Sequence, residues 1–138
     1  MTFKTFVKKS ERLFIQARYR ISCRDNISTI ICIQNAYKNE LDKYNHFAHF
    51  LRSSNKKTAI GQLLIKVLDD VVELLKNDSY EQAYDLVDAF HCLPSIFMAH
   101  GYVIPEDYWK LYVEPYSIKW DSTYLMSIKR IFGNILSI

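Results

Sequence analysis

The chain has 138 residues, of which 49% are hydrophobic, 14% aromatic and 24% charged, and it contains only three Gly and three Pro. This length fits one domain that buries about two-thirds of the surface of its unfolded chain. The apolar content excludes an intrinsically disordered chain, and the low Gly and Pro content excludes collagen-like and linker sequences. We therefore expect residues 1–138 to form a single domain.

The net charge of +3 conceals a division along the chain. Residues 1–57 contain 12 Lys and Arg against 4 Asp and Glu, which gives a net charge of +8. Residues 58–138 contain 6 Lys and Arg against 11 Asp and Glu, which gives a net charge of −5. The first half is therefore basic and the second half acidic.

The three cysteines, Cys23, Cys32 and Cys92, are odd in number and form no CxxC motif. They cannot all pair within the chain, and free cysteines usually behave as small buried hydrophobic side chains. This usage predicts a reducing, cytoplasmic location. No apolar run reaches the 18 or more residues that a transmembrane helix needs, so we expect no contact with a membrane.

Apolar residues recur at helical spacing through the first half of the chain. From Phe3 to Ile21 they occupy the i, i+3, i+4 and i+7 positions of one helix face, and Asp25-Asn26 predicts the break that follows. A second seam runs from Ile30 to Leu51 in steps of three and four residues, as in helix bundles. Two packed helices are therefore expected before residue 52.

The third helix is predicted to be the most hydrophobic. Residues 53–57 are the most polar stretch of the sequence and are expected to form a loop, with Thr58 capping the helix that follows. Apolar residues from Ile60 to Leu75 give this helix its buried face. Asn77-Asp78 is expected to end it, because both residues favour turns.

A capping box marks the start of a fourth helix. Ser79 is followed three residues later by Gln82, the spacing at which the two side chains cap the first turn. Pro94 is expected to stop or kink this helix.

Shorter helices are expected beyond Pro94: residues 96–100 closed by Gly101, a helix starting at Pro105-Glu106-Asp107, and, after Pro115, a last helix from Tyr116 or Asp121 to Phe132. No stretch alternates between apolar and polar residues for long enough to build a sheet. The sequence therefore predicts an all-α, compact bundle of five to six helices in a single domain.

Asp85, Asp88 and His91 follow one another at i, i+3 spacing and share a helix face. Asp88 can accept a hydrogen bond from His91, and a His near a helix C-terminus is also favourable without any further role. Cys92 follows His91 directly, but adjacent helical positions point about 100° apart. We therefore expect no contact between the thiol and the imidazole, and no cysteine-based catalysis.

Two further groups of side chains have a structural and a functional interpretation. Asp69, Asp70 and Glu73 form an acidic cluster, which is expected to be a solvated helix face. Basic residues of the first half are suited to phosphate, but they are spread around two helices and the acidic second half repels nucleic acid. The basic residues of that alternative are Lys4, Lys8, Arg12, Arg18 and Arg20.

Tyr and Trp are concentrated near the end of the chain: Tyr102, Tyr108, Trp109, Tyr112, Tyr116, Trp120 and Tyr124. Acidic residues lie among them: Glu106, Asp107, Glu114 and Asp121. Tyr and Trp are enriched at protein interfaces. An aromatic surface surrounded by acids is suited to a basic protein partner.

The segment Asp88-Ala-Phe-His-Cys-Leu-Pro94, followed by Tyr108-Trp109, Tyr116 and Lys119-Trp120, resembles a small helical type of immunity protein from bacterial contact-dependent-inhibition and polymorphic-toxin systems. Those proteins carry an Asp–His–Leu-Pro signature followed by Trp and Tyr. The resemblance covers residues 80–125, about a third of the chain, and Cys92 departs from the Asn expected at that position.

The resemblance implies a cytoplasmic antidote that binds one cognate toxin domain, often a nuclease, and blocks it without chemistry of its own. Residues 58–116 contain 3 Lys against 10 acids, and this local charge of −7 would speed association with a basic nuclease. Immunity proteins are commonly acidic overall, which this chain is not.

We therefore expect a non-enzymatic toxin-binding protein with no cofactor, no metal and no catalytic residue. The candidates for contact with the partner are Asp69, Asp70, Glu73, Asp85, Asp88, His91, Glu106, Asp107, Tyr108, Trp109, Tyr112 and Trp120. Two alternatives stay open: a nucleic-acid-binding helical module that uses the basic first half, and a metal-dependent helical enzyme that uses Asp85, Asp88 and His91.

Overall fold

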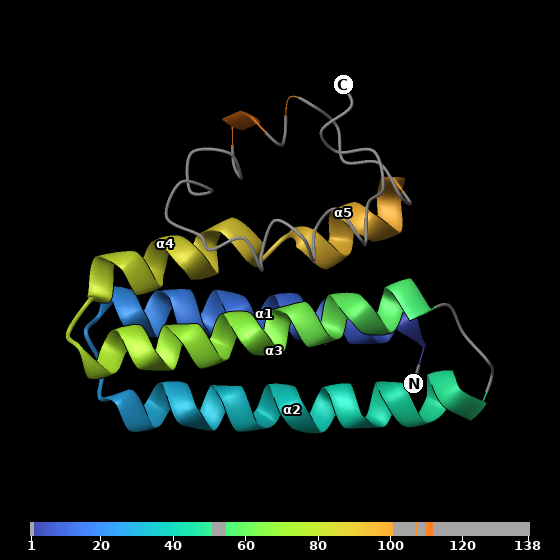
Figure 1. The fold of residues 1–138 in the computed structure, drawn as a ribbon, viewed down its shortest axis with the longest axis horizontal. Helices are drawn as coiled ribbons and strands as arrows, with labels where there is room; N and C mark the ends of the chain where they lie inside the picture. Colours follow the sequence, from blue (N-terminus) through green and yellow to red (C-terminus); the bar gives the residue numbers. More distant parts are fainter. Residues whose placement is uncertain (1, 51–54, 101–106, 108–109, 112–138) are drawn as a thin grey trace.

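The computed structural model describes residues 2–50, 55–100, 107 and 110–111, and Figure 1 shows the arrangement of their helices. The helices are α1 (Phe3–Ser22), α2 (Ile27–Phe50), α3 (Asn55–Lys76), α4 (Tyr80–Phe90) and α5 (Leu93–His100). These described residues contain no strand. The predicted all-α class is confirmed, and apart from residues 107 and 110–111, which are helical, the helices expected after residue 104 lie outside the described residues.

Successive long helices run antiparallel, so that α1 and α3 point in the direction opposite to α2 and α4 (Figure 1). Each of the helices α1 to α3 packs on the next one along the chain, and α4 returns to pack on α1, which closes a four-helix bundle of up-down-up-down topology. The short α5 continues in the direction of α4 and contacts α1. The N-terminus of α4 therefore lies at the same end of the bundle as the C-terminus of α1.

The core consists of the apolar seams that the sequence predicts. Of the first two seams, Phe6, Phe14, Ile21, Ile30, Tyr37, Leu41 and Tyr44 are all buried. The third helix buries every predicted apolar position from Ile60 to Leu75 except Leu74, which is partly buried. Aromatic rings of α1 and α2 pack directly on one another, with Phe6 and Tyr44 stacked at 5.1 Å between ring centroids.

Two buried tyrosines of α2 differ in how their hydroxyls are satisfied. Tyr37 donates a hydrogen bond of 3.3 Å to the carbonyl oxygen of Gly61, which ties α2 to α3. The hydroxyl of Tyr44 has no hydrogen-bond partner in the described part of the chain. Burial raises the pKa of both hydroxyls, so both stay protonated.

Helices α1 and α3 end in the same way, with a non-glycine residue in the left-handed conformation. Arg24 has φ 52° and Asp78 has φ 57°. At each end, backbone N–H groups bond to carbonyls three and five residues back, such as Asp25 to Arg20 and Ser79 to Leu74. This is the Schellman pattern, which satisfies the last carbonyl groups of a helix.

The predicted caps of the third and fourth helices are wrong in detail. Helix α3 begins at Asn55, so residues 55–57 of the expected loop are helical and Thr58 does not cap the helix. Ser79 precedes α4, but its side chain makes no capping hydrogen bond. Its backbone N–H already bonds to Leu74 in the turn that ends α3, and this tight connection replaces the capping box.

The effect predicted for Pro94 is also wrong. Helix α4 ends at Phe90, four residues before the proline, and α5 begins at Leu93. Pro94 is therefore the second residue of the next helix, where its fixed φ fits and its missing N–H costs nothing. His91 and Cys92 form the turn between the two helices.

Candidate functional site

The predicted acidic cluster on α3 is divided among separate contacts. Asp69 accepts a hydrogen bond of 2.5 Å from the amide of Gln34 and lies 3.8 Å from the amine of Lys38, both on α2. This carboxylate therefore joins α3 to α2, although its side chain is still 52% exposed.

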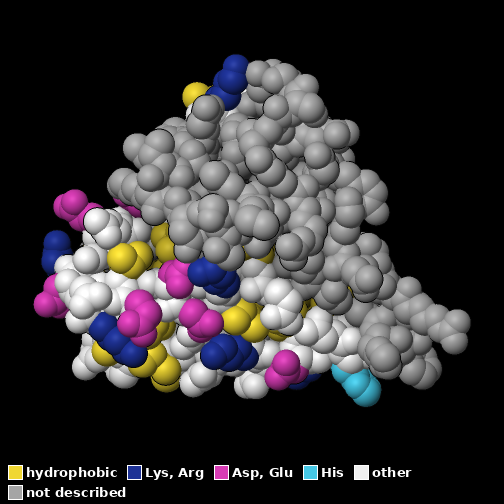
Figure 2. Space-filling view, viewed as in Figure 1, with side chains coloured by type: hydrophobic (Ala, Val, Ile, Leu, Met, Phe, Trp, Pro, Cys, Tyr) yellow, Lys and Arg dark blue, Asp and Glu magenta, His cyan; other side chains and the backbone are white. Residues whose placement is uncertain are grey.

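The other two acids of the cluster have lysine partners within α3. Asp70 lies 3.1 Å from Lys66, and Glu73 lies 3.1 Å from Lys76. Figure 2 shows the result on one face of the molecule, where dark blue basic and magenta acidic side chains alternate. The cluster is thus a mixed, solvated helix face, and it presents no concentrated negative charge to a partner.

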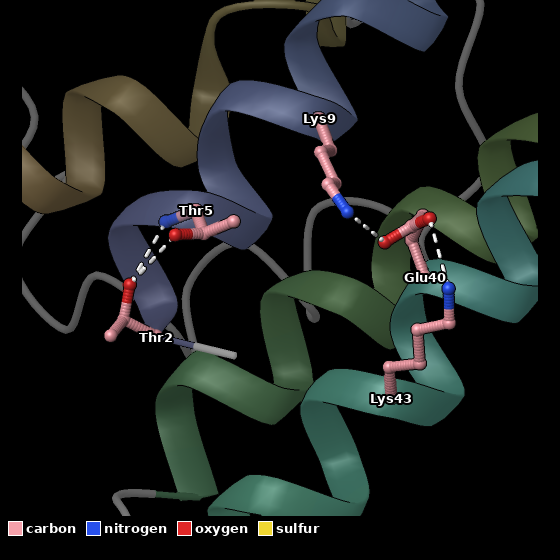
Figure 3. A network of polar contacts seen from close by, with 5 residues as sticks. All are labelled: Thr2, Thr5, Lys9, Glu40 and Lys43. Carbon is pink, nitrogen blue, oxygen red and sulfur yellow. Dashed lines mark hydrogen bonds and ion pairs between the residues drawn. The ribbon is translucent and has the colours of Figure 1, made fainter.

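Much of the basic charge of the first half is also paired. Figure 3 shows Glu40 of α2 between two lysines, 3.1 Å from Lys9 of α1 and 3.6 Å from Lys43. In the same view Thr2 caps α1 by accepting a hydrogen bond from the backbone N–H of Thr5. The first turn of α1 is fixed by its own cap, while Lys9 ties the helix to α2.

Arginines near the end of α1 are paired as well. Arg18 lies 2.6 Å from Asp88 of α4, and Arg20 lies 3.2 Å from Asp25. Lys4, Lys8 and Arg12 make no ion pair with another described residue. These three residues are exposed on α1, so the predicted set of five basic residues separates into two paired and three unpaired members.

The predicted hydrogen bond between the carboxylate of Asp88 and His91 is not formed. His91 Nδ1 lies 3.9 Å from Asp88 Oδ1, beyond hydrogen-bonding distance, and 2.7 Å from the carbonyl oxygen of the same residue. The carboxylate instead bonds to Arg18. His91 therefore closes the last turn of α4 through the backbone, and Asp88 joins α4 to α1.

The expectation that Cys92 and His91 do not meet is wrong. Cys92 Sγ lies 2.9 Å from His91 Nε2. The estimate of 100° between neighbours holds inside a helix, whereas Cys92 lies in the turn after α4 has ended. The expected burial of all three thiols is wrong too, because Cys23 and Cys32 are exposed and Cys92 is half-buried.

An open cavity of about 340 Å³ lies where the C-terminus of α1 meets the N-terminus of α4. Its lining residues are Ile21, Ser22, Arg24, Tyr80, Glu81, Tyr84 and Asp85. The guanidinium of Arg24 stacks over the ring of Tyr80, 4.9 Å from its centroid. Two tyrosine rings, two carboxylates and a bound guanidinium thus share one concave surface.

The sequence identified only part of this surface. Asp85 was among the predicted candidates, and the structure places it at the cavity. Tyr80 and Tyr84 were missed, although their i, i+4 spacing beside Glu81 is a signal that the sequence carries. Arg24 comes from a different helix end, so no spacing in the sequence links it to Tyr80.

The remaining candidates lie mostly beyond the described residues. Asp107 is described and exposed. Glu106, Tyr108, Trp109, Tyr112 and Trp120 lie outside the described residues.

The described residues contain no group of three or more His, Cys, Asp and Glu side chains arranged to hold a metal ion. Asp85 and Asp88 lie on α4, but His91 lies in the turn that follows, and the carboxylate of Asp88 is bonded to Arg18. Among the described helices, none combines the length and the apolar character that crossing a membrane requires. No protein-family model, curated protein or solved structure matches this chain.

Proposed function

We propose that this chain is a non-enzymatic protein-binding antidote, an immunity protein that neutralises a cognate bacterial toxin domain by covering it. The observation that supports this proposal is the cavity between α1 and α4, where Tyr80 and Tyr84 lie beside Glu81 and Asp85. Aromatic rings next to carboxylates bind cationic side chains through cation–π and ionic contacts. Such a surface is suited to a basic partner, as a nuclease is.

The contact between Arg24 and Tyr80 supports the same assignment. It shows that the rim of this cavity already holds one guanidinium by stacking. A partner's arginine inserted beside Tyr84 would meet the carboxylates of Glu81 and Asp85 from the open side. Burial of aromatic and charged anchors in such concave sites provides much of the binding energy of many interfaces.

The acids of α3 contribute less to this proposal than the sequence indicates. Asp70 and Glu73 each have a lysine 3.1 Å away, which cancels most of their long-range field. Glu81 is exposed and has no such neighbour among the described residues. We therefore place the binding surface on α4 and leave α3 at its margin.

The proposal is tested by co-expressing the full chain with the C-terminal domain encoded by the adjacent gene. We expect a stable complex and rescue of growth. The double variant Glu81→Lys/Asp85→Lys places like charges against a basic partner and should weaken the complex at least about tenfold. Asp70→Lys/Glu73→Lys is the matched control, since it makes the same charge change on α3 and should bind normally. Absence of both complex and rescue with the unaltered chain would refute the proposal.

A nucleic-acid-binding module is the second candidate, and one observation favours it. Lys4, Lys8 and Arg12 recur every four residues along α1 and are unpaired among the described residues, and Tyr19 farther along α1 is exposed. The probe is a random single-stranded oligonucleotide, read by fluorescence anisotropy at several salt concentrations. Binding that weakens with salt, and that is lost in Lys8→Glu/Arg12→Glu but kept in Glu81→Lys/Asp85→Lys, would favour this function over the antidote.

A further inference from the structure

The side chains of His91 and Cys92 form a bonded pair at the junction of α4 and α5. Cys92 Sγ lies 2.9 Å from His91 Nε2, and His91 Nδ1 lies 2.7 Å from the carbonyl oxygen of Asp88. A carbonyl oxygen only accepts hydrogen bonds, so Nδ1 carries the ring proton and Nε2 of the neutral ring accepts from the thiol. The thiol of Cys92, the imidazole that can act as its base, and the carbonyl group that orients the imidazole therefore form a chain of hydrogen bonds.

The position of Cys92 in the fold adds a second contribution. Cys92 directly precedes Leu93, the first residue of α5. Unpaired N–H groups and the positive end of the helix dipole stabilise an anion at this position. A thiolate next to an imidazolium and a helix N-terminus is the arrangement that makes cysteines reactive. Cys92 is half-buried and packs against the hydrophobic core.

Charged groups from two helices surround the junction. The carboxylate of Asp88 lies 3.9 Å from His91 Nδ1 and is held by Arg18 of α1 at 2.6 Å. Glu11 of α1 accepts a hydrogen bond of 2.7 Å from Ser95 of α5. Arg18 fixes the carboxylate of Asp88, the residue whose carbonyl oxygen bonds to His91 Nδ1. The pair of Arg18 and Asp88 thus steadies the end of α4 that holds the base, whereas the contact between Glu11 and Ser95 joins α5 to α1.

We propose that Cys92 is an activated thiol that hydroperoxides oxidise to a sulfenic acid. The thiolate sulfur attacks the terminal oxygen of the hydroperoxide, so that an S–O bond forms as the O–O bond breaks. Sulfur loses two electrons, and the departing hydroxide or alkoxide takes the Nε2 proton of His91 and leaves as water or an alcohol. This chemistry is independent of the binding surface at the other end of α4.

The unaltered full chain provides its own controls, because Cys23 and Cys32 are exposed free thiols. The measurement is the rate at which iodoacetamide alkylates each cysteine between about pH 5 and pH 9, followed by peptide mass spectrometry. The midpoint of each profile reports thiolate formation, whereas limited access to a sulfur lowers its rate at every pH by the same factor and leaves the midpoint in place. We expect the midpoint of Cys92 at least about one pH unit below the other two. A midpoint equal to theirs or higher would overturn the proposal.

Variants at the junction separate the role of His91 from that of the helix end. In His91→Gln the profile of Cys92 should move toward those of Cys23 and Cys32, whereas Ser95→Ala, which removes only the contact to Glu11, should leave it in place. A folded His91→Gln variant with an unchanged Cys92 profile would refute the role of the imidazole. If His91→Gln fails to fold, the midpoints of Cys92, Cys23 and Cys32 in the unaltered chain still decide whether Cys92 is activated.

The oxidation step has its own readout. Hydrogen peroxide is added to the unaltered chain together with a 1,3-diketone that traps sulfenic acids, and the adduct is quantified at each cysteine. Higher thiolate fraction, partly offset by lower intrinsic nucleophilicity, gives an expected preference of about fivefold for Cys92 over Cys23 and Cys32. Equal trapping at the three cysteines would show that the pair does not promote oxidation.

Discussion

The close approach of α2 and α3 at Gly61 makes one substitution especially informative. Replacing a helical glycine by alanine ordinarily stabilises a protein by about 0.5–1 kcal/mol. Here the added methyl group would overlap Leu41 Cδ1 and lie 3.5 Å from both Cγ and Cδ2 of the same side chain. Leu41 is 1% exposed, so its methyl group has to move into a packed core. Such overpacking costs about 1–3 kcal/mol, and we expect Gly61→Ala to lower the free energy of unfolding by about 1 kcal/mol.

A second background tests whether the overlap with Leu41 is the cause. Leu41→Ala costs about 3 kcal/mol by itself, but it removes the atoms that the new methyl group meets. In that background Gly61→Ala should stabilise by about 0.5–1 kcal/mol, so that the two substitutions are coupled by about 2 kcal/mol. Urea unfolding followed by circular dichroism measures all four free energies. Stabilisation by Gly61→Ala to the same extent in both backgrounds would refute the packing argument.

Two further substitutions act on features specific to this fold. Tyr44→Phe removes a buried hydroxyl without a described partner and should raise the free energy of unfolding by up to about 1 kcal/mol. Tyr37→Phe removes the bond to Gly61 and should lower the free energy of unfolding by about 0.5–1.5 kcal/mol. Urea unfolding measures both values, and an equal decrease in the two variants would contradict this difference. Asp78→Gly should stabilise the protein by about 0.5–1 kcal/mol, because Asp78 has φ 57°. Gln62→Gly, in the exposed face of α3, should destabilise the protein by a similar amount. A lower melting temperature for Asp78→Gly would count against backbone strain at the turn that ends α3.

The fold could be predicted from the sequence where burial is periodic. The seams from Phe3 to Ile21 and from Ile60 to Leu75 became buried helix faces because spacing alone decides which side of a helix is apolar. Helix ends were less predictable, because they depend on competition between neighbouring turns. Ser79 had the sequence of a capping residue, but the Schellman turn that ends α3 uses its backbone and sets its conformation.

The candidate site was harder to predict, because it joins separate helix ends. Asp85 was identified from its own helix, whereas Arg24 reaches Tyr80 only because α1 and α4 pack together. The contact between His91 and Cys92 was missed for a different reason. Its geometry depends on where α4 ends, and that end falls one residue before His91 instead of at Pro94. A shift of a few residues in a helix boundary thus decides whether the thiol and the imidazole meet.

The division of charge along the chain has a structural consequence of its own. The basic first half supplies Arg18 to Asp88 of α4 and Lys38 to Asp69 of α3, so ion pairs join each of the first two helices to one of the next two. Each partly exposed pair contributes at most about 1 kcal/mol. The two ion pairs therefore act mainly by favouring this arrangement of helices, since a bundle in which α3 and α4 exchanged places would lose both of them. Lys4, Lys8 and Arg12 have no part in this arrangement, and a partner's acidic group or a phosphate is the charge that they remain able to bind.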